Sequence, residues 1–146
     1  MSVEVRAPEA ADAAAMQAIY AQCIEAADWL PEAAKVAPVL AEVSRSEQQF
    51  VAFEADRVLG FVSVHVAESF IHHLFVREDA RRRGVGVLLL EALEGWLPRP
   101  WQLKCVRRNV VALRFYEGRG WREAGVGESE HGAYAVLTFN DEETHP

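Results

Sequence analysis

FIHHLFVREDARRRGVGVLLLEALEGW, residues 70–96, is the stretch of sequence that decides the fold. It begins with apolar, β-prone residues as far as Val76, passes through a charged turn, and continues from Val85 in a helical pattern. Gly84 and Gly86 lie where the first turn of that helix should begin, directly after three arginines. The first amides of a helix have no intrahelical acceptor, so this strand, loop and helix predict a site for an anion.

The loop itself reads R-R-R-G-V-G over residues 81–86 and follows a strand that ends in Leu74-Phe75-Val76. This order resembles the acyl-CoA-binding motif of the GNAT N-acetyltransferase superfamily, Q/R-x-x-G-x-G/A after a strand ending in L-x-V. The chain lacks the dinucleotide-binding G-x-G-x-x-G and the P-loop Gly-Lys-Ser/Thr. Taken alone, the loop is also compatible with an ordinary turn that has a solvated basic face.

A second stretch, N-V-V-A-L-R-F-Y-E-G-R-G-W over residues 109–121, resembles a later motif of the same superfamily. That motif is N-x-x-A-x-x-F-Y-x-x-x-G-F, and Trp121 stands here in place of the final Phe. The two motifs occur in the family's order and at its separation. The resemblance therefore implies one N-acetyltransferase domain over residues 1–146, with residues 141–146 as a mobile tail.

The predicted fold class is α/β (α+β), a mixed central sheet of about seven strands with about four helices. Short hairpin links make the first half of the sheet antiparallel, and the helix between strands four and five makes that pair parallel. The resemblance implies that these two strands splay apart around the pantetheine arm of the cofactor. The expected strands are 3–6, 49–54, 58–66, 70–76, 101–106, 121–123 and 133–140, and the expected helices are 12–26, 32–43, 85–97 and 109–118.

Composition limits the function further. A chain of 146 residues is long enough for one core. Its 22 acidic and 15 basic residues give a net charge of −7, which argues against a broad nucleic-acid surface. No apolar run has the length of a membrane span, and the N-terminus lacks a signal-peptide pattern. With two cysteines and no disulfide framework, the sequence predicts a cytoplasmic protein without nucleic-acid or membrane partners.

The resemblance implies acetyl-CoA as the acyl donor and assigns residues to it. The main-chain groups of Leu74 and Val76 would pair with the pantetheine arm, and Asn109 would contact the same region. The pyrophosphate would lie on the loop after the strand. The implied cofactor-binding set is Leu74, Val76, Arg81, Arg82, Arg83, Gly84, Val85, Gly86, Asn109 and Tyr116.

Acetyl transfer to an amine has two requirements that side chains can meet. An alkylamine with a pKa of about 10.4 must lose a proton before it attacks, and the departing thiolate must gain one. Tyr116, the Tyr of the motif's F-Y pair, is the predicted acid. His72 is the predicted base, since it lies two residues before L-x-V, where arylalkylamine-type members carry a catalytic His. Those members have another His at the position of Phe70, so His73, Glu68 and ordered water stay open as alternatives.

Regular alternation along a strand places His72 with Leu74 and Val76, and His73 on the opposite face with Ile71 and Phe75. Because the two histidines would then face opposite ways, with no third ligand nearby, the sequence predicts no metal site.

The acceptor is predicted to be a small-molecule, peptide or protein amine, contacted by Asp28, Trp29 and Glu68. The leading hypothesis is an acetyl-CoA-dependent N-acetyltransferase acting by direct attack in a ternary complex. The alternatives are a non-catalytic acyl-CoA sensor on the same fold and a nucleotide-binding or interaction domain whose glycines only turn the chain. The oligomeric state stays open, although a homodimer would be in keeping with the resemblance.

Overall fold

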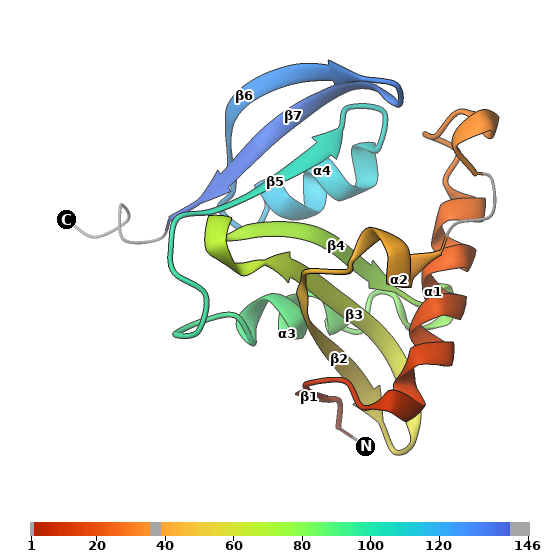
Figure 1. The fold of residues 1–146 in the computed structure, drawn as a ribbon. Coiled ribbons are helices and arrows are strands. Elements are labelled where there is room, and N and C mark those ends of the chain that lie inside the picture. Colours follow the sequence, from red (N-terminus) through yellow and green to blue (C-terminus); the bar gives the residue numbers. More distant parts are fainter. Residues whose placement is uncertain (1, 36–38, 141–146) are drawn as a thin grey trace.

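The computed structural model describes residues 2–35 and 39–140, which form one mixed sheet with helices on both sides (Figure 1). The sheet order is β1-β2-β3-β4-β5-β7-β6. The strands are β1 Glu4–Arg6, β2 Gln48–Glu54, β3 Arg57–His65, β4 Phe70–Val76, β5 Trp101–Val106, β6 Arg122–Ser129 and β7 Gly132–Phe139. The helices are α1 Ala13–Ala26, α2 Leu40–Val43, α3 Val85–Glu91 and α4 Val110–Glu117, with 3₁₀ turns η1 Ala10–Asp12, η2 Glu32–Lys35, η3 Val66–Glu68 and η4 Glu78–Ala80.

The predicted fold class is confirmed, and β4 and β5 have the predicted bounds. The predicted helix 32–43 is instead the 3₁₀ turn η2 and the short α2, with residues 36–38 outside the described part. The predicted helix 85–97 ends at Glu91, because Leu93, Glu94 and Trp96 donate to carbonyls three residues back. The predicted mobile tail, 141–146, also lies outside the described residues.

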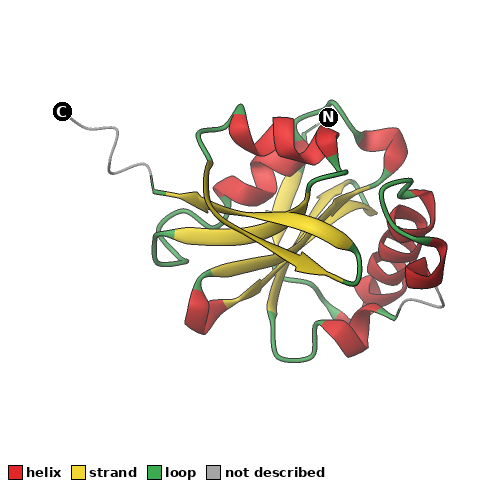
Figure 2. Cartoon of the chain, turned by 90° about the horizontal axis from the view of Figure 1, so that it is seen from above, coloured by secondary structure: helices red, strands yellow, loops and turns green. Residues whose placement is uncertain are grey.

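Both faces of the sheet are buried at β3, whereas β5 alternates between buried and exposed residues. Val51 packs with Met16 and Ile19 of α1, whereas its neighbour Ala52 belongs to the cluster that contains Leu89 of α3. Successive strand residues point to opposite faces, so α1 and α3 cover opposite sides of the sheet. Figure 2 shows from above that helices lie on both sides of the sheet. We call these sides the α1 face and the α3 face.

A β-bulge interrupts β4. Ser63 of β3 pairs with His73, but the next residue, Val64, pairs with Ile71, so His72 is an extra residue in β4. Beyond the extra residue of such a bulge, side chains alternate out of phase with those before it, so residues two positions apart across the bulge point to opposite faces. Ile71 therefore packs in the α3-face cluster, while His73 contacts Tyr20 of α1.

The parallel pair separates almost at once. Within the described residues, Phe70 of β4 and Gln102 of β5 are the only two residues of these strands that pair with each other. Figure 1 shows the two strands starting side by side and then diverging. The predicted splay of strands four and five is confirmed.

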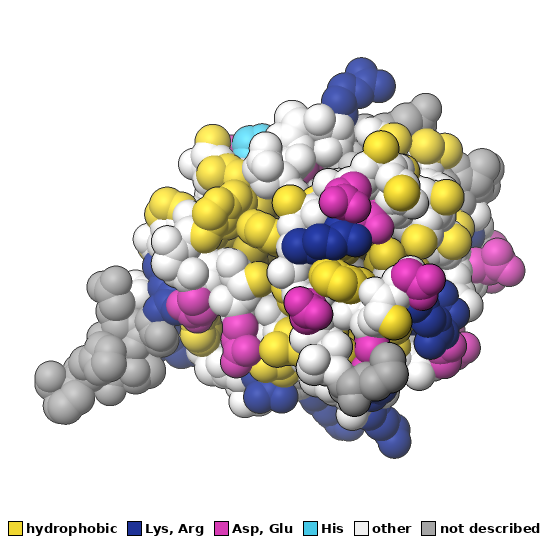
Figure 3. All heavy atoms as spheres, turned by 90° about the horizontal axis from the view of Figure 1, so that it is seen from below, with side chains coloured by type: hydrophobic (Ala, Val, Ile, Leu, Met, Phe, Trp, Pro, Cys, Tyr) yellow, Lys and Arg dark blue, Asp and Glu magenta, His cyan; other side chains and the backbone are white. Residues whose placement is uncertain are grey.

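Charged side chains of both signs are interspersed over the face seen from below, and basic residues do not form a continuous cover on it (Figure 3). None of the described helices is both long enough and apolar enough to span a membrane.

Candidate active site

The edge of β4 that faces the splay carries main-chain groups that have no neighbouring strand to pair with. Arg77 N–H donates to the Leu59 carbonyl at 2.8 Å, and residues of an antiparallel strand alternate between bonding their partner and pointing away from it. Leu74 and Val76 are therefore the residues whose N–H and C=O point away from β3, toward the diverging β5. This is the orientation that an added, strand-like ligand requires.

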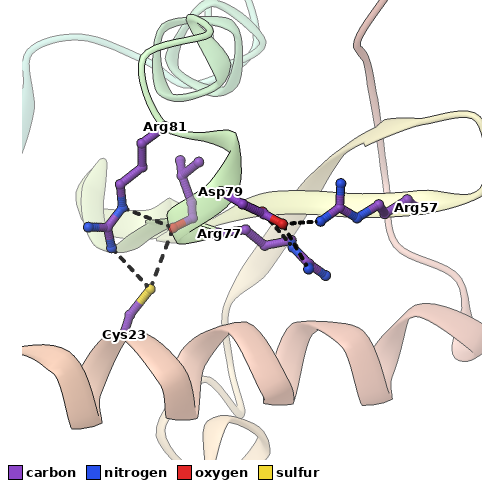
Figure 4. Close-up of polar contacts among 6 residues, drawn as sticks. Cys23, Arg57, Arg77, Asp79 and Arg81 are labelled. Carbon is purple, nitrogen blue, oxygen red and sulfur yellow. Dashed lines mark hydrogen bonds and ion pairs between the residues drawn. The ribbon is translucent and has the colours of Figure 1, made fainter.

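The Val76 carbonyl is already in contact with two side chains (Figure 4). It lies 3.6 Å from Cys23 Sγ, and Arg81 donates to it from Nε at 3.4 Å. Arg81 also lies 3.7 Å from the Cys23 sulfur through its Nη2. Burial raises the pKa of the Cys23 thiol, so the sulfur keeps its proton and can donate it to the carbonyl.

Ion pairs fix the loop between β4 and α3 to the β2–β3 hairpin. Arg83 binds Glu54 at 2.7 Å and lowers the pKa of that carboxyl. Asp79 accepts hydrogen bonds from Arg77 and Arg57, which lower its pKa in turn (Figure 4). Arg82 differs from the other two arginines of the motif: it is exposed, and within residues 2–35 and 39–140 it makes no hydrogen bond or ion pair.

The two glycines of the loop have different roles. Gly84 has a φ of +80°, which disfavours other residues, and a Cβ added there would meet no atom within 4 Å. A Cβ on Gly86 would lie 3.4 Å from the ring of Phe115 in α4. Open space therefore adjoins Gly84, whereas a Cβ on Gly86 would make a van der Waals contact with α4.

Tyr116 lies in α4 and is 8% exposed, between Phe115 and Trp121 on the α3 face. Burial raises the pKa of its hydroxyl, which keeps the proton at neutral pH. Asn109 is the N-cap of the same helix and accepts a hydrogen bond from the amide of Ala112 at 3.3 Å. This capping role fixes the start of α4 beside the end of β5.

His72 does not share a face with Leu74 and Val76, as regular alternation had predicted. Because of the bulge, its ring stacks on that of His73, with centroids 3.9 Å apart, on the α1 face. His72 Nδ1 contacts the carboxylate of Glu47, whose other oxygen accepts a hydrogen bond from Ser63 at 2.5 Å. A carboxylate on one ring nitrogen fixes the tautomer and orientation of an imidazole and leaves the other nitrogen free to accept a proton.

His73 lies deeper than His72. Its ring contacts Tyr20 edge-on and stacks on Phe75, and its Nε2 has no hydrogen-bond partner among the described residues. Burial, with a smaller contribution from His72, lowers the pKa of His73 to about 3. A base with so low a pKa is poorly suited to remove a proton from an ammonium group.

The three predicted acceptor residues lie at two ends of the splay. The carbonyl of Asp28 accepts a hydrogen bond from Arg108 at 3.4 Å, which places the segment with the half-buried Trp29 beside the loop after β5. Glu68 lies in η3, before β4, and its carboxylate is 3.7 Å from His65. Their role toward an acceptor stays a prediction.

Sequence reasoning missed Glu47 and Ser63. Counting outward from the β2–β3 turn, where Glu54 pairs with Arg57, would place Gln49 opposite Val62; a register shift between Ala52 and Phe53 pairs it with Ser63 instead and brings Glu47 near that residue. The bulge that brings His72 to the same place has no signal in the local sequence.

The family model of the acetyltransferase (GNAT) family matches residues 13–121, about three quarters of the chain. The chain belongs to this family. In this GNAT domain the matched region extends from the start of α1 to Trp121, so it includes both predicted motifs and the His72 cluster. The resemblance read from the sequence is thereby confirmed.

Solved structures agree on the GNAT fold. Apo-form YjaB from Escherichia coli is 22% identical with a TM-score of 0.78, over 95% of this chain and 98% of that one. A GCN5-related N-acetyltransferase from Rhodopseudomonas palustris is 22% identical with a TM-score of 0.77, and the match covers 94% of this chain and 95% of that one. The structure of yncA from Salmonella typhimurium with its cofactor acetyl-CoA is 16% identical with a TM-score of 0.71, and the match covers 96% of this chain and 94% of that one. Among curated proteins, none matches the chain significantly.

Proposed function

We propose that the protein is an acetyl-CoA-dependent N-acetyltransferase that transfers an acetyl group to a primary amine by direct attack in a ternary complex. The observation that carries the proposal is the splay: β4 and β5 diverge after the pair Phe70 and Gln102, and leave the main-chain groups of Leu74 and Val76 without a partner strand. That edge of β4 leads directly into the loop that ends at Gly84, the N-cap of α3.

The donor is held largely by main chain. The pantetheine arm pairs with Leu74 and Val76, and its amides replace the contacts that Cys23 and Arg81 make with the Val76 carbonyl. The pyrophosphate takes the open space at Gly84, where amides at the start of α3 point outward. Arg82 and the released Arg81 supply positive charge there.

The two predicted catalytic residues lie on opposite faces of the sheet, His72 on the α1 face and Tyr116 on the α3 face. A thioester in the gap between the strands is then open to an amine from one side and to a proton donor from the other. His72, oriented by Glu47, takes the proton from the ammonium group. The amine nitrogen forms a bond to the carbonyl carbon and the C–S bond breaks. The nitrogen loses its second proton to solvent, while Tyr116 donates its proton to the sulfur and is reprotonated from solvent.

Isothermal titration with acetyl-CoA tests donor binding. We expect saturable binding to the wild type and a loss of roughly tenfold or more for Gly84→Asp, because the added carboxylate repels the phosphates and removes charge-assisted hydrogen bonds. Gly95→Asp is the matched control, since Gly95 also has a positive φ, +74°, and open space around it. Absence of binding in well-folded wild type would refute the proposal.

Turnover separates the enzyme from a non-catalytic acyl-CoA sensor. Free thiol released from acetyl-CoA is measured with a panel of amines and amino-terminal peptides. We expect His72→Ala and Glu47→Gln to lower kcat while binding acetyl-CoA as the wild type does. Binding without turnover for every acceptor would favour the sensor.

A further inference from the structure

The sequence predicted no metal site because His72 and His73 were expected on opposite faces of their strand, and this does not hold in the folded chain. The bulge in β4 brings His72 and His73 to the same face, and Glu47 lies against them. One donor atom from each of the three residues lies within 4.8 Å of the other two. Two imidazole nitrogens from the middle of β4 and one carboxylate from the residue that precedes β2 therefore converge.

The carboxylate of this cluster is held firmly. The Glu47 side chain is 7% exposed, and one of its oxygens accepts the hydrogen bond from Ser63. Gln49 donates to the Ser63 hydroxyl at 3.4 Å and to Ser44 at 3.3 Å. Hydrogen bonds of this kind orient a ligating carboxylate and leave its second oxygen to the metal.

His73 supplies a second, independent observation. Its Nε2 is buried and has no hydrogen-bond partner among the described residues, although buried polar atoms are nearly always paired. Contacts with Tyr20 and Phe75 fix the ring in that position. A metal ion would provide the missing partner.

We propose that Glu47, His72 and His73 form a binding site for Zn²⁺. Two nitrogens and one carboxylate oxygen suit zinc, and water would complete a tetrahedral set. Donor atoms around tetrahedral zinc lie roughly 3.3 Å apart. The contact between Glu47 and His72 must therefore open slightly, and a turn of the His72 side chain, which is 41% exposed, allows this.

Zinc at this position blocks acetyl transfer, a consequence that rests on the proposed function. A neutral imidazole has one nitrogen lone pair to share, because the other ring nitrogen carries the hydrogen. Zinc uses that lone pair whichever nitrogen of His72 it binds. His72 is then unable to accept a proton from the acceptor amine.

Cobalt binding tests the site without any acetyl-CoA. Tag-free protein is treated with EDTA, dialysed, and titrated with Co²⁺, whose visible absorption reports its coordination, and Zn²⁺ is then added in competition. We expect one Co²⁺ per chain with the spectrum of a four- or five-coordinate ion, displaced by stoichiometric Zn²⁺. Ser63→Ala, which frees the carboxylate, is expected to weaken binding by about 10- to 100-fold.

Glu47→Gln and His73→Phe remove one ligand each with little change in volume, and both should abolish the cobalt spectrum. His131→Ala is the control, since His131 lies between β6 and β7, outside the cluster. All variants are checked for folding by circular dichroism. The proposal is wrong if wild type shows no saturable binding at micromolar Co²⁺, or if Glu47→Gln and His73→Phe bind as the wild type does.

Enzyme assays then test the consequence separately. EDTA-treated wild type should turn over, and Zn²⁺ should inhibit it at the concentration that displaces Co²⁺. Inhibition should be lost in His73→Phe, which keeps His72. Zinc that binds at the cluster and leaves turnover unchanged would refute the role of His72 as the base, and the metal site would stand.

Discussion

The sulfur of Cys23 and the guanidinium of Arg81 lie 3.7 Å apart, and both contact the Val76 carbonyl that the pantetheine arm is proposed to use. Cys23 comes from α1 and Arg81 from the loop after β4, so their contact joins the α1 face to the cofactor loop. Binding of the donor has to replace these contacts. The strength of the contacts therefore sets part of the affinity for acetyl-CoA.

Removal of the thiol should favour the donor. We expect Cys23→Ala to bind acetyl-CoA about two- to tenfold more tightly, because the Val76 carbonyl no longer exchanges one hydrogen bond for another. Isothermal titration measures the change. Gln22→Ala, at the exposed neighbouring position of α1, is the control and should bind as the wild type does. A weaker complex for Cys23→Ala would show that the thiol supports donor binding.

Tyr116→Phe removes the proposed proton donor and keeps the ring packed against Phe115 and Trp121. We expect kcat to fall by roughly 100-fold, as for the loss of a general acid, with little change in the affinity for acetyl-CoA. Steady-state thiol release and isothermal titration measure the two quantities. Tyr134→Phe in β7 is the matched control and should keep its kcat. An unchanged kcat in Tyr116→Phe would leave the thiolate to be protonated by solvent.

His73 should make the metal-free protein less stable in mild acid. Its pKa of about 3 lies below the value of about 6.5 in the unfolded chain, so the unfolded state binds the extra proton between these values. The contribution of neutral His73 to the free energy of unfolding is fully present above about pH 6.5. It is lost by up to about 1.4 kcal/mol per pH unit as the pH falls toward 3. Urea unfolding in EDTA between pH 7 and pH 5 measures the slope.

His73→Phe should reduce that slope by the contribution of one proton. Phe75→Leu destabilises the same cluster without removing a titratable group, so it should lower the free energy of unfolding and keep the slope. Equal slopes in the wild type and His73→Phe would contradict the buried, neutral state of His73.

Gly60 permits the close approach of β3 and β4. A Cβ at this position would lie 2.7 Å from the carbonyl oxygen of Phe75, which belongs to the backbone and cannot move away alone. We expect Gly60→Ala to lower the free energy of unfolding by about 1–3 kcal/mol in urea titrations. Gly125→Ala is the control, because its nearest neighbour would be a Val136 side-chain atom at 3.8 Å. Equal losses in the two variants would rule out the clash as the cause.

Local sequence determined the elements that carry the cofactor motifs. The bounds of β4 and β5 followed from runs of apolar and β-branched residues, and the start of α4 followed from Asn109 as its N-cap. Gly84 predicted the turn, since glycine adopts a φ such as the observed +80° without strain. Each of these features depends on residues that are close together in the chain. The sequence alone was therefore enough to predict them and to indicate the family.

The arrangement of the candidate base was decided by the tertiary structure. Period-two alternation separated His72 from His73, but a single bulge, set by how β4 pairs with β3, brought their rings together. Glu47 joins them only through the register of β2, and Cys23 reaches Val76 only because α1 packs across β4. Contacts between residues 25 to 53 positions apart depend on strand register and helix packing, which the whole core fixes and no local pattern encodes.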